Sequence, residues 1–185
     1  MLLPFLFGHS LAIALNIDDI HVAENGRAYE IQMTFDVIAS ADQVMAVLTD
    51  YGFPDRLDPE VTKRDVVSQH GAITRVRTEI RACVFLFCKD IALTQDVTVI
   101  AGTIQADIVP GESDFQTGYL RWSVSSSDTG GARISFMAIM EPDFFIPPVI
   151  GGFFARRKLR QKILATAENL EAEAAREPAP VASWN

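Results

Sequence analysis

The sequence predicts an α+β fold in which an antiparallel sheet of about six or seven strands is followed by one long C-terminal helix. Apolar and polar residues alternate in short segments between Ile17 and Met140, which is the pattern of half-buried strands. Short turns containing Asn-Gly, His-Gly or Pro-Gly separate these segments, so consecutive strands are expected to pair. Beyond Pro148 the apolar spacing changes to three and four residues, which is typical of an amphipathic helix.

The composition indicates a single globular domain and excludes several classes of function. The 185 residues are 49% hydrophobic and 22% charged, enough to bury a core without added cross-links. With 16 basic and 24 acidic residues the net charge is -8, which excludes nucleic acid as a general partner. The two cysteines cannot form a four-ligand zinc site, and the three histidines lie far from them in sequence. We therefore expect no bound metal and no cofactor.

The first fourteen residues, MLLPFLFGHSLAIA, are predicted to form a signal-like leader. They contain no charged side chain and end in an A-x-A cleavage pattern. They are too short to span a bilayer, which takes about 20 residues. The basic residues that normally precede such a segment are missing, so either the leader is degenerate or the true start lies upstream of Met1. The alternative is an apolar segment packed against the domain.

A hairpin and a short helix are expected at the start of the domain, which we place at residues 15–175. Asn25-Gly26 is a strong two-residue turn signal, and residues 29–37 after it alternate strictly between apolar and polar. Ser40 is predicted to cap a helix whose apolar residues lie within 44–48. Further strands are predicted at residues 61–69, 72–87, 91–100, 103–108, 119–124 and 132–140.

The last element is predicted to run from near Pro148 to near Ala174. Its apolar stripe consists of Ile150, Phe153, Phe154, Leu159, Ile163, Ala167, Leu170 and Ala174. Residues 176–185 have no periodicity and are expected to be a loose tail.

Two stretches resemble a known superfamily. Residues 39–51 (ASADQVMAVLTDY) resemble the helix entry after the first long strand in START-like, or SRPBCC, proteins of the coenzyme Q-binding and polyketide cyclase branches. Residues 141–148 (EPDFFIPP) resemble the strand-to-helix junction of exported bacterial members. The resemblance extends from about residue 17 to 174 and implies a helix-grip fold. In that fold a curved sheet wraps around the C-terminal helix and leaves an apolar cavity between them.

Cys83 and Cys88 allow two interpretations. In one continuous strand they point to opposite faces roughly 16 Å apart, which is too far for a disulfide. If the chain instead turns at residues 84–87, the cysteines face each other. That register also aligns Arg81 with Asp90, Arg75 with Asp96, Ile80 with Ile91 and Thr78 with Leu93. Because only the hairpin explains the charges, we predict it together with a Cys83–Cys88 disulfide; the alternative is two free thiols.

The resemblance and this register together give the candidate ligand-binding residues. Two polar residues, Thr78 and Gln95, are expected on the inner face, where they would orient a ligand. The apolar lining is predicted among Ile80, Ile91, Leu93, Trp122, Phe136 and Phe154. A cavity wall and a packed core have the same sequence pattern, so core packing is the alternative for these aromatic residues.

Two further features allow a contact with an anionic membrane. Phe85 and Phe87 lie in the apolar hairpin tip, which is either packed under a loop or exposed as a lip. The basic run at residues 156–162 contains Arg156, Arg157 and Lys158 beside two phenylalanines. Basic residues next to exposed aromatics favour a membrane interface, and the alternative is a solvated helix face.

The function predicted from these features is binding or carriage of a hydrophobic small molecule, such as a lipid, quinone or polyketide-like compound, in the bacterial periplasm. No nucleophile elbow, phosphate loop or paired-histidine motif is present, and His21 and His70 fall at or beside predicted turns. No catalytic residue is therefore proposed, and an enzyme is disfavoured. The alternatives are a cyclase/dehydratase-type enzyme that uses the same cavity and a protein-binding regulator.

Overall fold

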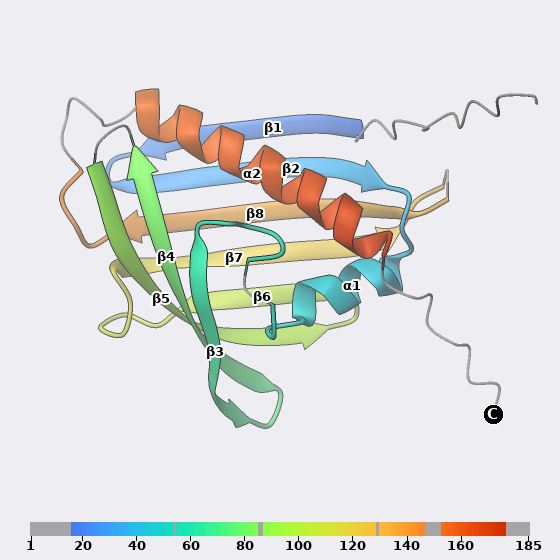
Figure 1. The fold of residues 1–185 in the computed structure, drawn as a ribbon, viewed down its shortest axis with the longest axis horizontal. Helices are drawn as coiled ribbons and strands as arrows, with labels where there is room; N and C mark the ends of the chain where they lie inside the picture. Colours follow the sequence, from blue (N-terminus) through green and yellow to red (C-terminus); the bar gives the residue numbers. More distant parts are fainter. Residues whose placement is uncertain (1–15, 54, 85–86, 129, 147–152, 177–185) are drawn as a thin grey trace, which may run out of the picture.

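An eight-stranded antiparallel sheet carries both helices on one face (Figure 1). The computed structural model describes residues 16–53, 55–84, 87–128, 130–146 and 153–176. The strands are β1 (Asn16–Asn25), β2 (Ala28–Val37), β3 (Val61–His70), β4 (Ile73–Val84), β5 (Phe87–Ile100), β6 (Thr103–Ile108), β7 (Phe115–Ser126) and β8 (Ala132–Pro142). The helices are α1 (Ala41–Thr49) and α2 (Phe153–Ala174). The predicted fold class is confirmed, with one or two more strands than expected.

The sheet order is β1-β2-β8-β7-β6-β5-β4-β3, so the chain returns in its last strand to pair with its second. The sheet thus has two parts: the hairpin β1-β2 at one edge, and a meander in which β3 to β8 pair in sequence order, with β3 at the other edge. The strand direction changes strongly between β8 and β4, and the sheet curves around α2 (Figure 1). The face that carries the helices is called the concave face below.

Helix α1 begins where the sequence predicts. The Ser40 side chain accepts a hydrogen bond from the Gln43 amide at 3.3 Å, and the Gln43 side chain accepts one from the Ser40 amide at 3.0 Å. This reciprocal capping box satisfies two amides of the first turn that have no partner within the helix. Val44 and Val47 are buried against the sheet, which fixes the helix over the ends of β7 and β8.

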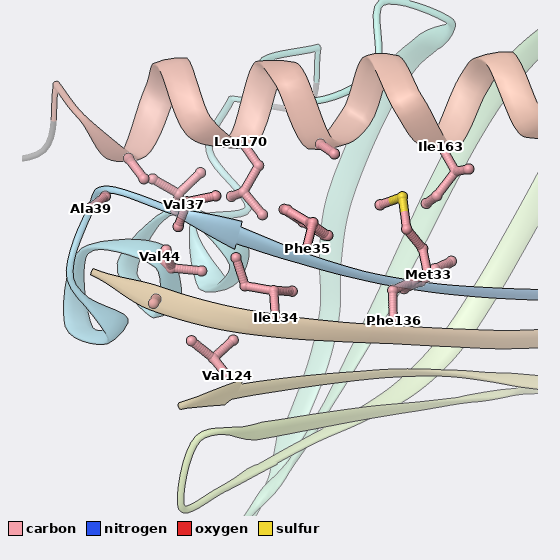
Figure 2. Close-up of a cluster of buried hydrophobic side chains, with 14 of the residues drawn as sticks. Met33, Phe35, Val37, Ala39, Val44, Val124, Ile134, Phe136, Ile163 and Leu170 are labelled. Atoms are coloured by element: carbon pink, nitrogen blue, oxygen red, sulfur yellow. The ribbon is translucent and has the colours of Figure 1, made fainter. Parts of the chain in front are cut away.

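The main core lies between the C-terminal half of α2 and the strands β2 and β8 (Figure 2). Four residues of α2, Ile163, Ala167, Leu170 and Ala174, fall on one helical face and are buried there. They pack against sheet residues such as Phe35 and Ile134, both fully buried. This core occupies one end of the concave face.

The predicted stripe of α2 is buried only in its second half. Phe153 is 62% exposed and Phe154 is 37% exposed, although both fit the apolar spacing. Residues 147–152 lie outside the described residues, and so do the predicted leader and residues 177–185 of the predicted tail. The helix therefore begins, within the described chain, as a partly exposed segment and becomes a core element after Ile163.

Candidate ligand-binding site

The strand register places seven of the eight predicted ligand-binding residues on the concave face. Cross-strand partners share a face of the sheet, and the relevant pairs are Ile80–Ile91, Thr78–Leu93, Gln95–Ile108 and Trp122–Phe136. Leu93, Phe136, Thr78 and Gln95 are buried, whereas Ile80, Ile91 and Trp122 are half-buried. The predicted β4–β5 register is thus confirmed, while a role for these residues in lining a cavity stays a prediction.

Two aromatic candidates are also in contact with each other. The rings of Trp122 and Phe136 lie 4.3 Å apart between centroids, and Phe136 belongs to the main core. The eighth candidate, Phe154, lies on the first turn of α2, where its ring meets Phe153 edge to face at 5.4 Å.

Three polar side chains are buried among the described residues: Thr78, Thr94 and Gln95. Thr94 points to the opposite face, where its hydroxyl donates to the Glu112 carbonyl at 2.9 Å. The Gln95 amide donates to the Ala106 carbonyl at 3.5 Å, the outer limit of a hydrogen bond. Thr78 has no side-chain hydrogen bond to a described residue. Of the three buried polar side chains, the two predicted candidates Thr78 and Gln95 therefore have the weaker hydrogen bonding.

Arg64 is a concave-face residue that the sequence analysis missed. It is half-buried on β3 and pairs with Thr78 of β4. A β-bulge between Val61 and Lys63 shifts the alternation of β3, so that Arg64 points to the same face as Val61. Burial lowers the pKa of the Arg64 guanidinium, and the opposing effects of Tyr51 and Asp58 are smaller.

Tyr51 follows α1 and packs on the same region of the sheet. It contacts the small core formed by Val76, Val97, Ile104 and Ala106. Burial raises the pKa of the Tyr51 hydroxyl, against a smaller opposite effect of the charge on Arg64. The hydroxyl is therefore protonated at neutral pH and able to donate a hydrogen bond on the part of the concave face that also carries Arg64.

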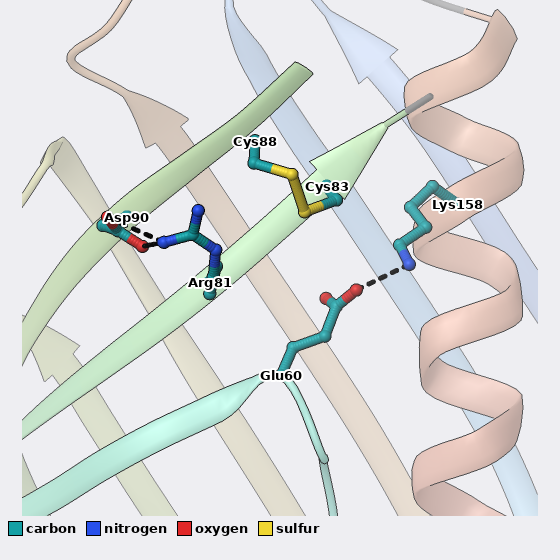
Figure 3. Close-up of a disulfide and its surroundings, with 6 residues drawn as sticks. All are labelled: Glu60, Arg81, Cys83, Cys88, Asp90 and Lys158. Atoms are coloured by element: carbon teal, nitrogen blue, oxygen red, sulfur yellow. Dashed lines mark hydrogen bonds and ion pairs between the residues drawn. A yellow bond between two sulfur atoms is a disulfide. The ribbon is translucent and has the colours of Figure 1, made fainter. Parts of the chain in front are cut away.

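The hairpin β4–β5 is closed by a disulfide, as predicted (Figure 3). The sulfur atoms of Cys83 and Cys88 are bonded at 2.07 Å, and the two residues are cross-strand partners. Arg81 contacts Asp90 at 3.0 Å. Phe85 and the side chain of Phe87 lie outside the described part of the chain, so their contact with a rim or membrane stays a prediction.

Arg75 and Asp96 form the second predicted charge pair of this hairpin, through two hydrogen bonds of 2.8 Å. The hydrogen bonds from Arg75 lower the pKa of the Asp96 carboxyl more than the small loss of hydration raises it. The hairpin register therefore has one charged pair near each end of the paired strands and the disulfide close to the tip.

Side chains of the basic run of α2 contact two segments of the chain, strand β1 and the residues just before β3. On one side Arg156 contacts Glu24 of β1 at 3.2 Å, and Arg160 donates to the Ile20 carbonyl of the same strand at 3.1 Å. On the other side Lys158 contacts Glu60 at 2.6 Å (Figure 3). Lys162 reaches the same segment, contacting Asp58 at 2.8 Å and Glu60 at 2.9 Å.

These partners alter the basis for the predicted membrane contact. Of the three cations proposed to meet lipid, Arg156 and Lys158 are ion-paired within the chain, and Arg157 is exposed and forms no ion pair with any described residue. The contact itself stays a prediction. Neither described helix combines the length and hydrophobicity needed to cross a bilayer.

No group of three or more His, Cys, Asp or Glu side chains within the described ranges is arranged to hold a metal ion. His21 lies on β1 and His70 on β3, which are the two edge strands of the sheet, and both side chains are exposed.

Comparison with known proteins gives one family match over most of the chain. The family model described as polyketide cyclase / dehydrase and lipid transport matches residues 28–175. No curated protein matches the sequence.

Several solved structures share the fold. A STAR-related lipid transfer protein from Xanthomonas axonopodis is 15% identical, with a TM-score of 0.63 over 86% of this chain and 100% of that one. A START superfamily protein from Mycobacterium smegmatis is 14% identical, with a TM-score of 0.62 over 79% and 97%. The Zhui aromatase/cyclase from a Streptomyces species is 18% identical, with a TM-score of 0.62 over 80% and 94%. At these identities the similarity extends to the fold alone.

Proposed function

Because the chain belongs to the polyketide cyclase / dehydrase and lipid transport family, we propose that it binds and carries a hydrophobic small molecule between the concave face and α2. The family and the START-like neighbours support hydrophobic-ligand binding or cyclase activity as the broader function. The observation that favours carriage is the chemistry of the concave face. Its buried polar groups within the described residues are a hydroxyl and an amide, and neither is an acid or base at neutral pH.

Burial of apolar ligand surface would supply the affinity. Each Å² removed from water contributes about 25 cal/mol, so a lipid-sized molecule needs few specific contacts. Thr78 and Gln95 support orientation of such a ligand, because both are buried there with unused or weak hydrogen bonds. A cyclase would need an inward base in addition to the same apolar surface, and Arg64 and Tyr51, the ionisable residues described above on this face, are both protonated at neutral pH.

The test is binding of the neutral fluorescent probe Nile red, followed by its displacement with apolar molecules. Leu93→Trp places a bulky ring on the buried concave face and should weaken probe binding several-fold. The matched control is Ser135→Trp, which adds the same ring at an exposed position of β8 on the opposite face. Thermal melts of both variants verify folding. Equal probe affinity for wild type and Leu93→Trp, or no binding to wild type, contradicts the proposal.

Native mass spectrometry of protein purified from its own host separates carriage from the two alternatives. A co-purified lipid or quinone supports carriage. A site that is empty and turns over an aromatic polyketide supports the cyclase alternative, which the three-dimensional similarity to the Zhui aromatase/cyclase keeps open. A bound protein supports the regulator alternative.

We also propose that the protein works outside the cytoplasm. Two features support this: the leader-like residues 1–14 and the cross-strand pairing of the two cysteines. Disulfides persist in oxidising compartments and are rare in the cytosol. Fusion of residues 1–30, with any upstream codons, to a reporter active only after export should give signal. Mature protein that retains Met1 in the host's soluble cytoplasm contradicts export.

A further inference from the structure

Arg64 differs from the other half-buried cations of the described residues. Each of the others has a hydrogen-bond or ion-pair partner: Arg56, Arg75, Arg77, Arg156, Lys158 and Lys162. Arg64 has neither a hydrogen bond nor an ion pair with any described residue. Its sequence neighbour Lys63 is exposed and contacts Asp65 at 2.7 Å, so the lack of a partner is specific to the inward position.

The carboxylate whose charge acts on Arg64 makes its hydrogen bond and its ion pair with other residues. Asp58 is the only acidic residue whose charge acts on Arg64 among the described residues. One of its oxygens, Oδ1, accepts the Glu60 amide at 3.0 Å, and Oδ2 contacts the Lys162 ammonium at 2.8 Å. Both carboxylate oxygens are therefore already used to attach α2 and the segment before β3.

The position of Arg64 makes this lack of a partner costly. Arg64 of β3 is the cross-strand partner of Thr78 of β4, and Thr78 is in turn the partner of Leu93 of β5. Both Thr78 and Leu93 are buried on this face of the sheet. Arginine stays charged even where loss of hydration lowers its pKa, as it does here. A charge withdrawn from water without a counter-charge destabilises the protein, so an anion from outside the chain would be bound with little competition.

Two neutral donors accompany the guanidinium. Tyr51 packs on the apolar residues of β4 to β6, including Val76, which lies two residues from Thr78 on the same face of β4. Burial raises the pKa of the Tyr51 hydroxyl, and the charge on Arg64 lowers it slightly. Thr78 lies opposite Arg64 with a hydroxyl that no described residue binds. A cation and two hydroxyls beside an apolar surface match an amphiphile, a molecule with an anionic oxygen headgroup and an apolar tail.

We propose that Arg64, assisted by Tyr51 and Thr78, binds the anionic headgroup of an amphiphilic ligand whose apolar part lies on the concave face. This specifies the ligand class of the site and rests on the proposed function. A carboxylate and a phosphate monoester both present the required oxygens, and both pair with a guanidinium through two hydrogen bonds.

The experiment is displacement of Nile red by three competitors with the same eighteen-carbon chain: oleate, oleyl alcohol and oleoyl lysophosphatidate. Wild-type protein should bind at least one anionic competitor about tenfold or more tightly than the alcohol, as expected for a desolvated charged hydrogen bond. Arg64→Met should reduce this preference to about one and leave the affinity for the alcohol unchanged. Arg64→Lys keeps the charge and should restore part of the preference.

Arg121→Met is the matched control, because Arg121 is an exposed cation on β7 whose side chain donates to Gln105 on the opposite face. It should keep the full preference for the anion. The relative response to oleate and lysophosphatidate identifies the headgroup class.

Equal wild-type affinities for the alcohol and both anions overturn this inference and leave the proposed function intact, because the alcohol still binds. Failure of all three competitors and of the probe overturns both. Comparison of ligands on wild-type protein keeps the test decisive even if Arg64→Met does not fold.

Discussion

Reduction of the Cys83–Cys88 bond removes a cross-link from the unfolded chain while the surrounding hairpin keeps its other contacts. The bond joins residues five apart in sequence, so it closes a short loop. In the chain-entropy treatment such a loop lowers the unfolding free energy by about 2 kcal/mol when it is opened. The register itself should persist, because Arg81–Asp90 and Arg75–Asp96 remain paired across the same two strands.

The assay is urea unfolding of oxidised protein, of protein reduced with a phosphine, and of the Cys83→Ser/Cys88→Ser double variant. Reduced protein and double variant should unfold at the same, lower urea concentration. In thermal melts the loss should be about 4–8 °C for a domain of this size. Reductant should not change the double variant. Coincident curves for oxidised and reduced wild type, with alkylation showing that the oxidised sample contains no free thiol, would refute the reasoning.

Four further substitutions test the core packing of α2, the tight approach of a turn to the chain after β2, and the charges that attach α2. Leu170→Ala opens a cavity at a fully buried position of α2 and should cost about 2–5 kcal/mol in urea unfolding. Gly131→Ala places a Cβ 2.1 Å from the Val37 carbonyl oxygen, whereas Gly130→Ala at nearly the same positive φ meets no atom within 4 Å. The first should therefore be the more destabilising of the two, and equal losses would show that φ alone matters. For Glu60, burial raises the carboxyl pKa, but the hydrogen bonds from two lysines of α2 outweigh it and lower the pKa below its ordinary 4.5. Its stabilisation is thus present above pH 4.5 and lost as the pH falls through the folded-state pKa, and the stability gap between wild type and Glu60→Gln should shrink over that range.

The parts that the sequence predicts well are those decided by local pattern. Strict alternation in β2 and the turn at Asn25-Gly26 suffice to place the first hairpin. The β4–β5 register follows from charges that lie close in sequence, because only one alignment pairs Arg81 with Asp90 and the two cysteines with each other.

The parts that it misses depend on long-range contacts or on a break in the pattern. The bulge between Val61 and Lys63 reverses the alternation of β3, so simple parity would direct Arg64 to solvent. The partners of the basic run come from residues 20–24 and 58–60, more than ninety positions earlier in the chain, and no local signal connects them to α2. From sequence alone, a helix with five cations is therefore compatible with both a solvated face and a membrane-facing surface.

The two halves of α2 are attached by different forces, and this difference determines where the concave face can open. The second half buries Ile163 and Leu170 in the core, and burial of such side chains contributes about 1.5–3 kcal/mol each. The first half is joined to β1 and to Glu60 by partly exposed ion pairs, which contribute about 0–1 kcal/mol each, and only the partly buried Leu159 of this half packs against the main core. Separation of the helix from the sheet therefore costs least at its first turns, where Lys158 lies near the disulfide-closed end of β4 (Figure 3). We therefore expect the first turns of α2 to exchange their amide hydrogens faster than the turns that carry Ile163 and Leu170, and equal exchange along the helix would contradict this comparison of the two attachments.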